Sequence, residues 1–207
     1  MADVLAFFGG TFDPVHCGHL IVARSVVEQA GLDRLTFVPA GVPPHKAGAH
    51  VAAEHRLAML KRAVAGHADL AVSDIELSRP GRSFTYDTLC ALRELHPRAR
   101  LAWLIGLDML EDLPRWYRAA DLVREFEILV ALRPPGGPLL ASAMAAARSA
   151  FGVQAARRLT SRVLETPLID ISSTAIRARV RAGQPIDWLV PPAVARYVQE
   201  HGLYTET

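Results

Sequence analysis

Short apolar runs alternate along this chain with longer segments in which apolar residues recur every three or four positions. A continuous apolar run is typical of a strand buried on both faces, whereas the longer spacing is typical of a helix with one buried face. The runs predict strands over Val4–Phe8, Leu35–Val38, Leu70–Ile75, Leu101–Ile105, Ile128–Leu132 and Val163–Ile169.

Helical periodicity fills the intervals between these runs. In the first interval Leu20, Ala23, Val27 and Ala30 share one helix face, and Gly31 follows as a C-terminal cap. Further helices are predicted over 57–64 with its end at Gly66, over Thr85–His96, on a segment carrying Trp116 and Leu122, over Leu139–Ala150, and through Ile176, Val180, Val194 and Val198.

Strand–helix alternation of this kind predicts an α/β fold, a doubly wound parallel sheet with helices on both faces. The length favours a single domain over 1–207, in which 171–207 forms a small helical C-terminal section. Ligands of such sheets bind at the carboxyl ends of the strands, where the strand order reverses. The turn after the first strand is therefore the first place to look for a site.

Composition excludes several classes of protein. Hydrophobic residues make up 51% of the chain and charged residues 21%, which is ordinary for a globular domain, and a net charge of +2 gives no support for nucleic-acid binding. No apolar stretch approaches the roughly 20 residues of a membrane helix, and the N-terminus lacks the features of a signal peptide. Because Cys17 and Cys90 make neither a disulfide framework nor a metal-type pair, we expect a reduced, cytoplasmic protein.

The first strand runs into GGTFDPVHCGHL, residues 9–20, which carries candidate chemistry. A helix N-terminus presents unpaired backbone N–H groups and binds anions, and Gly9 and Gly10 permit a tight turn and a close phosphate. His16 and His19, three residues apart, should point the same way and donate N–H groups to phosphoryl oxygens. A capping role for the histidines, a zinc pair, and a nucleophilic Cys17 are the alternatives that the residues leave open.

The motif G-G-T-F-D-P-x-H-x-G-H resembles the opening of the H-x-G-H nucleotidyltransferases. The resemblance continues through PAGVPPHK (39–46), SFTYDTL (83–89), IGLDMLEDLPRW (105–116), ISSTAIRARVRAG (171–183) and LVPPAVARYVQEHGLY (189–204). In this order the motifs are similar to those of bacterial nicotinate mononucleotide adenylyltransferases, and they cover nearly the whole chain. The resemblance implies a Rossmann-like nucleotidyltransferase fold and transfer of AMP from ATP to nicotinate mononucleotide, which yields deamido-NAD and pyrophosphate.

The resemblance also implies roles for individual residues, and it names the catalytic group as His16, His19, Lys46 and Arg177. ATP would contact Gly9, Gly10, Thr11, Phe12, His16, His19, Gly106, Asp108, Ser172, Thr174 and Arg177. Nicotinate mononucleotide would contact Lys46, the indole of Trp116, and backbone groups around Thr85 and Tyr117. No protein metal site is expected, because Mg²⁺ arrives with ATP and takes many of its ligands from phosphates. Phe84 departs from the tyrosine expected before Thr85, which puts a hydroxyl role there in doubt.

Within this segment Ser172 should cap a helix that begins near Ser173, so that Arg177 extends from its first turn toward the β- and γ-phosphates. The alternative is an ordinary capped helix with surface arginines, which explains Arg179 and Arg181 better than Arg177.

Other functions remain as alternatives. The same transfer could take place on nicotinamide mononucleotide or on phosphopantetheine, although SFTYDTL and the Trp116 region argue against the latter. A non-catalytic nucleotide sensor would also keep the anion-binding turn. A DNA-binding module is disfavoured by the weak net charge. The sequence leaves open whether the chain forms a homo-oligomer.

Overall fold

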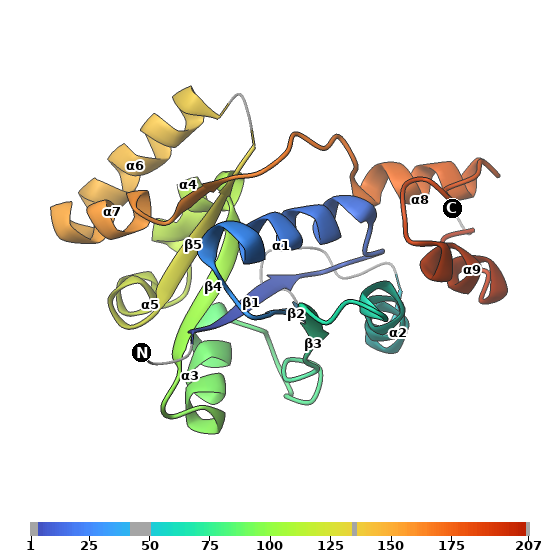
Figure 1. Ribbon diagram of the computed structural model, residues 1–207, viewed down its shortest axis with the longest axis horizontal. Coiled ribbons are helices and arrows are strands. Elements are labelled where there is room, and N and C mark those ends of the chain that lie inside the picture. The colour runs from blue at the N-terminus through green and yellow to red at the C-terminus, as the bar shows by residue number, and fades with distance from the viewer. Residues whose placement is uncertain (1–3, 42–50, 134–135, 206–207) are drawn as a thin grey trace.

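Six strands pair side by side in one parallel sheet in the computed structural model, which describes residues 4–41, 51–133 and 136–205. The strands are β1 (Val4–Gly10), β2 (Leu35–Pro39), β3 (Leu70–Val72), β4 (Arg100–Gly106), β5 (Glu127–Leu132) and β6 (Val163–Glu165). Their spatial order is β3-β2-β1-β4-β5-β6, so the order reverses between β1 and β4. The predicted doubly wound α/β fold is confirmed, and Figure 1 shows helices on both faces of the sheet.

The helices divide into two sets that cover opposite faces of the sheet. One set comprises α1 (Cys17–Ala30), α2 (Ala53–Val64), α8 (Ser173–Arg181) and α9 (Pro192–Glu200). The other comprises α3 (Thr85–Leu95), α4 (Leu107–Asp112), the 3-10 helix η1 (Leu113–Arg115), α5 (Ala119–Glu125), α6 (Gly137–Phe151) and α7 (Val153–Thr160). Successive strand residues face opposite ways, so Ala6 joins the first core and Phe7 the second.

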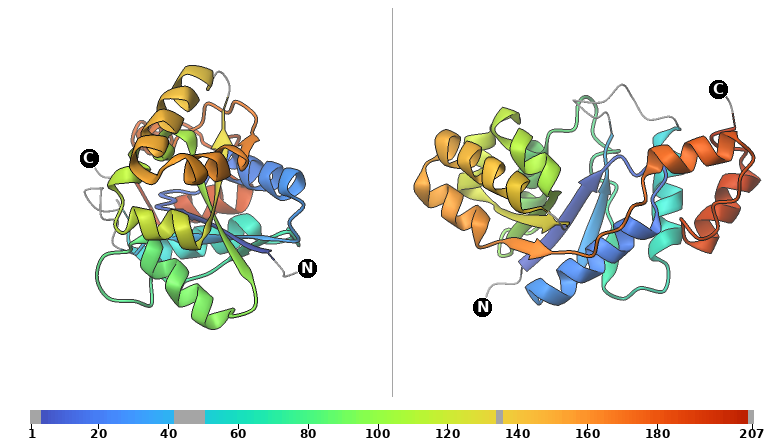
Figure 2. Two further views of the ribbon diagram at one scale, coloured as in Figure 1. Left: turned by 90° about the vertical axis from the view of Figure 1, so that its left-hand side faces the viewer. Right: turned by 90° about the horizontal axis from the view of Figure 1, so that it is seen from above.

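The C-terminal section is helical, as predicted, and it joins the same core as α1 and α2. Figure 2 shows the segment after β6 running beside α1 before it enters α8. The next helix, α9, packs on α2, where His55 Nδ1 and the Tyr197 hydroxyl are 3.0 Å apart. Within the described ranges no helix has both the length and the apolarity needed to cross a membrane.

Several predicted boundaries were wrong. The last strand stops at Glu165 rather than Ile169, because Pro167 has no N–H to continue a ladder. The third stops at Val72 rather than Ile75, since Asp74 opens a turn whose carbonyl accepts the Leu77 N–H. Trp116 does not lie on one helix with Leu122.

Two short helices flank Trp116 instead. The break between them falls at Arg118, whose backbone is left-handed with φ 52° and ψ 37°. The periodicity analysis also missed α4 and α7, which are too short to show a long apolar period.

Candidate active site

The turn after β1 is shaped by aromatic rings that occupy the space beside two glycines. A Cβ on Gly9 would come within 2.1 Å of Trp103 Cζ2, and one on Gly10 within 2.8 Å of Phe12 Cζ. Both glycines were expected to admit a phosphate. The structure gives them a further role, because only glycine leaves room for these two rings.

Phe12 turns the chain at the end of this strand and is itself buried. Its backbone is left-handed, with φ 50°, a conformation that costs a non-glycine residue about 1–2 kcal/mol. The ring packs edge-on against Phe8, Phe37 and His19 at centroid distances of 5.5, 5.4 and 5.0 Å. This burial offsets the backbone cost and fixes the position of the His19 ring.

The two histidines lie face to face at the start of α1, as their spacing predicted. Their ring centroids are 3.7 Å apart and the rings are inclined by 26°. The His16 backbone N–H donates to His19 Nδ1 at 3.2 Å, so the proton of a neutral His19 is on Nε2. Gly18 lies beneath the pair, and a Cβ there would be 3.0 Å from His16 Nδ1. The glycine of the H-x-G-H motif therefore makes room for the first histidine.

His16 is neutral at physiological pH in this setting. Its side chain is buried, and burial together with the positive charge of Arg133 lowers its pKa from 6.5 to about 4. Its Nδ1 atom is buried and has no hydrogen-bond partner among the described residues. The imidazole can therefore act as a neutral N–H donor that needs no pH change to engage a phosphate.

The N-terminus of α1 offers fewer backbone donors than the sequence suggested. The Cys17 N–H donates to the Leu189 carbonyl at 2.9 Å, and the His19 N–H donates to the His16 carbonyl at 2.9 Å. The expectation that this helix start presents unpaired N–H groups was therefore wrong for these two residues. Burial also raises the pKa of the Cys17 thiol, which argues against a nucleophilic role.

The start of α8 forms the opposite wall of the site. Ser172 caps the helix, as predicted, by accepting the Ala175 N–H at 3.1 Å, and Ser173 Oγ donates to the Pro14 carbonyl at 2.9 Å. Arg177 Nη1 donates to the Asp13 carbonyl at 2.7 Å, and Nη2 donates to Thr174 Oγ1 at 3.3 Å. The guanidinium thus spans from α8 to the turn after β1.

Part of this arginine remains available to a ligand. The Arg177 Nε atom is buried and lacks a partner among the described residues. Arginine carries five N–H donors, so two hydrogen bonds to the protein leave others for phosphate oxygens.

Three residues that the sequence analysis did not single out complete the site. Arg133 follows β5 and lines the same cavity as the histidines. Tyr204 donates a buried hydrogen bond of 2.7 Å to Asp13 Oδ1, and burial followed by this bond raises the pKa of the phenol. Arg56 is 2% exposed, and its Nη1 donates to the Thr11 carbonyl at 2.9 Å.

Only one of these three carried a signal in the sequence. A charged residue directly after a buried strand, as at Arg133, is placed at the ligand edge of a parallel sheet. The contacts of Arg56 and Tyr204 join segments far apart in the chain, and nothing in the local pattern reports them.

A cavity of about 600 Å³ lies at the carboxyl ends of β1, β4 and β5. Its lining includes every residue expected on the ATP side: Gly9, Gly10, Thr11, Phe12, His16, His19, Gly106, Asp108, Ser172, Thr174 and Arg177. The position agrees with the reversal of strand order between β1 and β4.

A second cavity, of about 250 Å³, adjoins the first. Three residues expected on the mononucleotide side, Thr85, Trp116 and Tyr117, line it together with Trp103. The carboxyl ends of β1 and β4 line both cavities, so they form a shared wall. The fourth expected residue, Lys46, lies outside the described residues.

Acidic side chains are sparse around both cavities. In the described part of the chain, no three His, Cys, Asp or Glu residues gather closely enough to hold a metal ion. Asp108 is exposed on the rim of the larger cavity, and the Asp13 carboxylate accepts the Tyr204 hydroxyl. In the smaller cavity Glu76 is buried, and burial raises its pKa.

The chain is similar to known proteins over most of its length. Residues 7–179 match the family described as cytidylyltransferase-like. A "Probable nicotinate-nucleotide adenylyltransferase" of Synechococcus sp. (strain JA-2-3B'a(2-13)) is 42% identical over 98% of this chain and 97% of the relative. The nicotinate-nucleotide adenylyltransferase of Bacillus subtilis (strain 168) is 36% identical over 97% of each chain.

Among solved structures, the Plasmodium falciparum nicotinic acid mononucleotide adenylyltransferase complexed with NaAD aligns with a TM-score of 0.73. The alignment covers 98% of this chain and 97% of the other at 19% identity. At that identity the likeness supports the fold, including the sheet at whose edge both cavities lie.

Proposed function

This chain belongs to the nicotinate-nucleotide adenylyltransferases of the cytidylyltransferase-like family, and we propose that its two adjoining cavities hold the two substrates of that reaction. The larger cavity takes ATP and the smaller one takes nicotinate mononucleotide. The observation that carries the proposal is the wall that both cavities share at the carboxyl ends of β1 and β4. Substrates on either side of that wall would meet at the turn after β1.

The reaction joins the 5′-phosphate of nicotinate mononucleotide to the α-phosphorus of ATP, and pyrophosphate leaves. The attacking phosphate monoester has a second pKa of about 6, so it is already largely dianionic at neutral pH. No general base is needed, and catalysis can rest on alignment and on neutralising charge at the α-phosphate. A neutral His16 imidazole beside His19, in a cavity whose described lining is sparse in carboxylates, suits this chemistry.

His16 and His19 are the proposed donors to the α-phosphate. His19 would donate from Nε2, because its Nδ1 accepts the His16 backbone N–H. His16 stays neutral because burial lowers its pKa to about 4, so the two rings can stack without charge repulsion. Preorganised donors of this kind stabilise charge that develops in the transition state.

The outer phosphates would lie between α8 and the end of β5. Arg177 is held on the Asp13 carbonyl and would contribute its remaining N–H groups to the departing pyrophosphate. Arg133 lines the same cavity and adds a second positive charge. Two guanidinium groups near a leaving pyrophosphate would offset the charge that accumulates there.

Magnesium fits this site as an ion carried by the nucleotide. The described residues offer no three-ligand cluster, and Asp108 is exposed on the cavity rim, so phosphate oxygens and water would supply most of the ligands. When bound, Mg²⁺ would neutralise phosphate charge. The protein's own part is to orient the triphosphate through the turn, the histidines and Arg177.

At the pyridine end, the proposed contacts are one indole and two backbone groups. Trp116 is half-buried in the smaller cavity and can stack on the ring. Thr85 is the first residue of α3, so its N–H has no partner within that helix. With the N–H of Tyr117 it would bind the nicotinate carboxylate. The Phe84 ring packs on Tyr117 at 4.6 Å, so the aromatic face is kept without a hydroxyl.

The test is pyrophosphate release from ATP with nicotinate mononucleotide, nicotinamide mononucleotide and phosphopantetheine as acceptors. We expect the acid to be the preferred acceptor. His19→Ala should lower kcat about a hundredfold through loss of one transition-state donor. His96→Ala, which removes an exposed histidine at the end of α3, serves as the control and should leave kcat unchanged. Preference for another acceptor, or normal turnover in His19→Ala, would reject the proposal.

A further inference from the structure

A first segment, residues 84–86, and a second segment, residues 117–118, meet beside the smaller cavity and make two contacts. Phe84 and Tyr117 pack ring on ring, with centroids 4.6 Å apart. One or two residues further along each segment, the guanidinium carbon of Arg118 lies 4.1 Å from the ring centroid of Tyr86. Thr85 lies between the two aromatic residues of the first segment. The two backbone groups assigned to the nicotinate carboxylate are thus adjacent to both contacts.

Neither of these two N–H groups donates a hydrogen bond to another described residue. The Thr85 N–H is at the first position of α3, where helix geometry provides no acceptor. Tyr117 lies between η1 and α5, and its N–H donates no hydrogen bond to the described residues. A carboxylate can accept from both, whereas an amide offers one oxygen and an NH₂ group that cannot accept.

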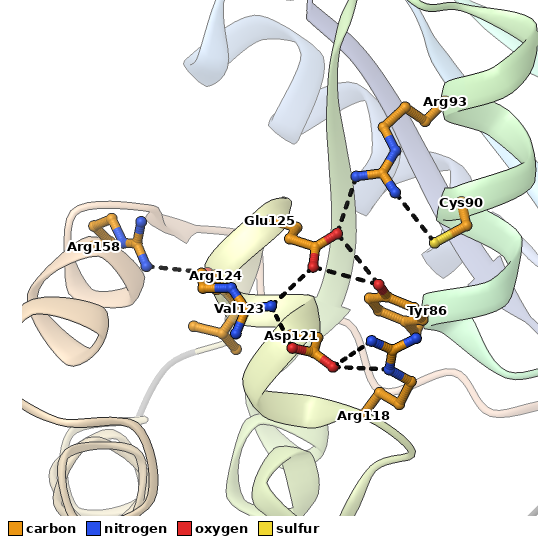
Figure 3. A network of polar contacts seen from close by, with 9 residues as sticks. All are labelled: Tyr86, Cys90, Arg93, Arg118, Asp121, Val123, Arg124, Glu125 and Arg158. Atoms are coloured by element: carbon orange, nitrogen blue, oxygen red, sulfur yellow. Dashed lines mark hydrogen bonds and ion pairs between the residues drawn. The ribbon is translucent and has the colours of Figure 1, made fainter.

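Arg118, in the second segment, combines an unusual backbone conformation with several side-chain contacts. Its φ of 52° and ψ of 37° are left-handed, which costs a non-glycine residue about 1–3 kcal/mol. Its carbonyl accepts the Leu122 N–H at 2.9 Å, which starts α5. Its Nε donates to Asp121 Oδ2 at 2.8 Å, and Nη2 is 2.6 Å from the same oxygen. Figure 3 shows this pair beside the Tyr86 ring.

Tyr86, the partner of Arg118, is buried and hydrogen-bonded. It is 5% exposed, and its hydroxyl donates to Glu125 at 3.3 Å. Glu125 also accepts from Arg93 and from Arg124, each at 3.0 Å, so the tyrosine is tied into a wider network (Figure 3). The contact between Arg118 and Tyr86 therefore links α3, which carries Thr85, to the segment that carries Tyr117.

We propose that Arg118 is a positioning residue that, through its contact with Tyr86, sets the spacing of the Thr85 and Tyr117 N–H groups and so the preference for nicotinate over nicotinamide mononucleotide. This inference rests on the proposed function. Two correctly spaced donors favour a carboxylate, because each makes a charge-assisted hydrogen bond. They disfavour the amide, since one donor would face the NH₂ group. When the spacing of the two N–H groups is lost, the affinity for nicotinate mononucleotide falls more than the affinity for nicotinamide mononucleotide.

The experiment compares two variants that remove the guanidinium with one conservative variant. Arg118→Asn and Arg118→Gly both accept a left-handed backbone but remove the contact with Tyr86, whereas Arg118→Lys keeps a cation over the ring. Arg124→Gln is the matched control. It removes a neighbouring arginine of α5 that also pairs with Asp121 and Glu125, whereas the cation over the Tyr86 ring is that of Arg118.

The readouts are kcat/KM for each mononucleotide, KM for ATP, and the affinity for each mononucleotide by calorimetry without ATP. We expect Arg118→Asn and Arg118→Gly to lower the acid-to-amide ratio about tenfold, equivalent to ~1.4 kcal/mol, with KM for ATP unchanged. Arg118→Lys should keep most of the ratio, and Arg124→Gln should keep all of it. Thermal unfolding of each variant checks that the fold is intact.

An equal fall in kcat/KM and affinity for the two mononucleotides would overturn the proposal, because loss of a merely structural residue would weaken the binding of both. An equal fall of the ratio in Arg124→Gln would overturn it too. The proposed function fails in a different way, namely if the unaltered protein neither binds nor adenylylates nicotinate mononucleotide. The calorimetric ratio is measured without turnover, so the two failures are distinguishable.

Discussion

Replacing Gly18 with alanine should lower the catalytic rate without lowering the stability of the fold. A Cβ at this position would be 3.0 Å from His16 Nδ1 and 3.2 Å from Cε1, whereas ordinary contacts begin at 3.4 Å. The imidazole must therefore move by about 0.4 Å. Because a misplacement of about 1 Å can cost a hundredfold in rate, we expect kcat to fall about five- to tenfold.

The free energy of unfolding should rise or stay unchanged. Gly18 is the second residue of α1, and alanine is favoured over glycine in a helix by up to about 1 kcal/mol. The pair of measurements is kcat by pyrophosphate release at saturating substrates and Tm by circular dichroism.

The matched control is Gly137→Ala, at the first position of α6. A Cβ there would meet no atom within 4 Å, so kcat should be unchanged. Wild-type kcat in Gly18→Ala would show that the position of the His16 ring does not limit the reaction. A fall of several degrees in Tm would show that the backbone yields instead of the ring.

Three further predictions follow from the site. The unfolded chain takes up a proton on His16 below about pH 6.5, whereas the folded chain does so only near the lowered pKa of about 4. The free energy of unfolding that this group contributes should therefore be full above pH 6.5 and fall by about 3 kcal/mol toward pH 4. Urea unfolding at pH 5 and pH 7 should show this fall, and the His16→Gln variant should lack the part of it that is due to His16. Tyr204→Phe removes the hydrogen bond to Asp13 and should lower stability by about 2 kcal/mol, or Tm by ~6 °C in calorimetry, whereas an unchanged Tm would mean that the bond is not a net contributor. Trp116→Ala should raise KM for the mononucleotide about tenfold and leave KM for ATP unchanged, and a parallel rise of both would contradict stacking on the pyridine.

Local sequence patterns predicted the sheet and the paired histidines after β1 because both depend on short-range features. The apolar run 4–8 and the following glycines are contiguous, and the caps at Gly31 and Ser172 were found in the predicted places. His16 and His19 are close because His16 is the N-cap residue of α1 and its backbone N–H donates to His19 Nδ1, three residues on.

The remaining features depend on contacts between distant segments. Arg56 lies in a helical pattern where an arginine usually faces solvent, yet it is buried with donors on the carbonyls of Thr11 and Gly41. The irregular stretch at Trp116 was predicted as helix, since periodicity cannot report the left-handed turn at Arg118. The pattern likewise gave no sign that Leu189 would occupy the Cys17 N–H.

The hydrogen bond from Tyr204 to Asp13 joins residues 191 positions apart and gives the chain an order of assembly. The turn that carries Asp13 leaves the ribosome early, but its partner is synthesised only when nearly all of the chain has emerged. A nascent chain can pair β1 with β2 and β4 well before then. The turn before the two histidines is thus synthesised early and gains its hydrogen bond to Tyr204 last, so an unfinished chain would carry the histidines without this contact.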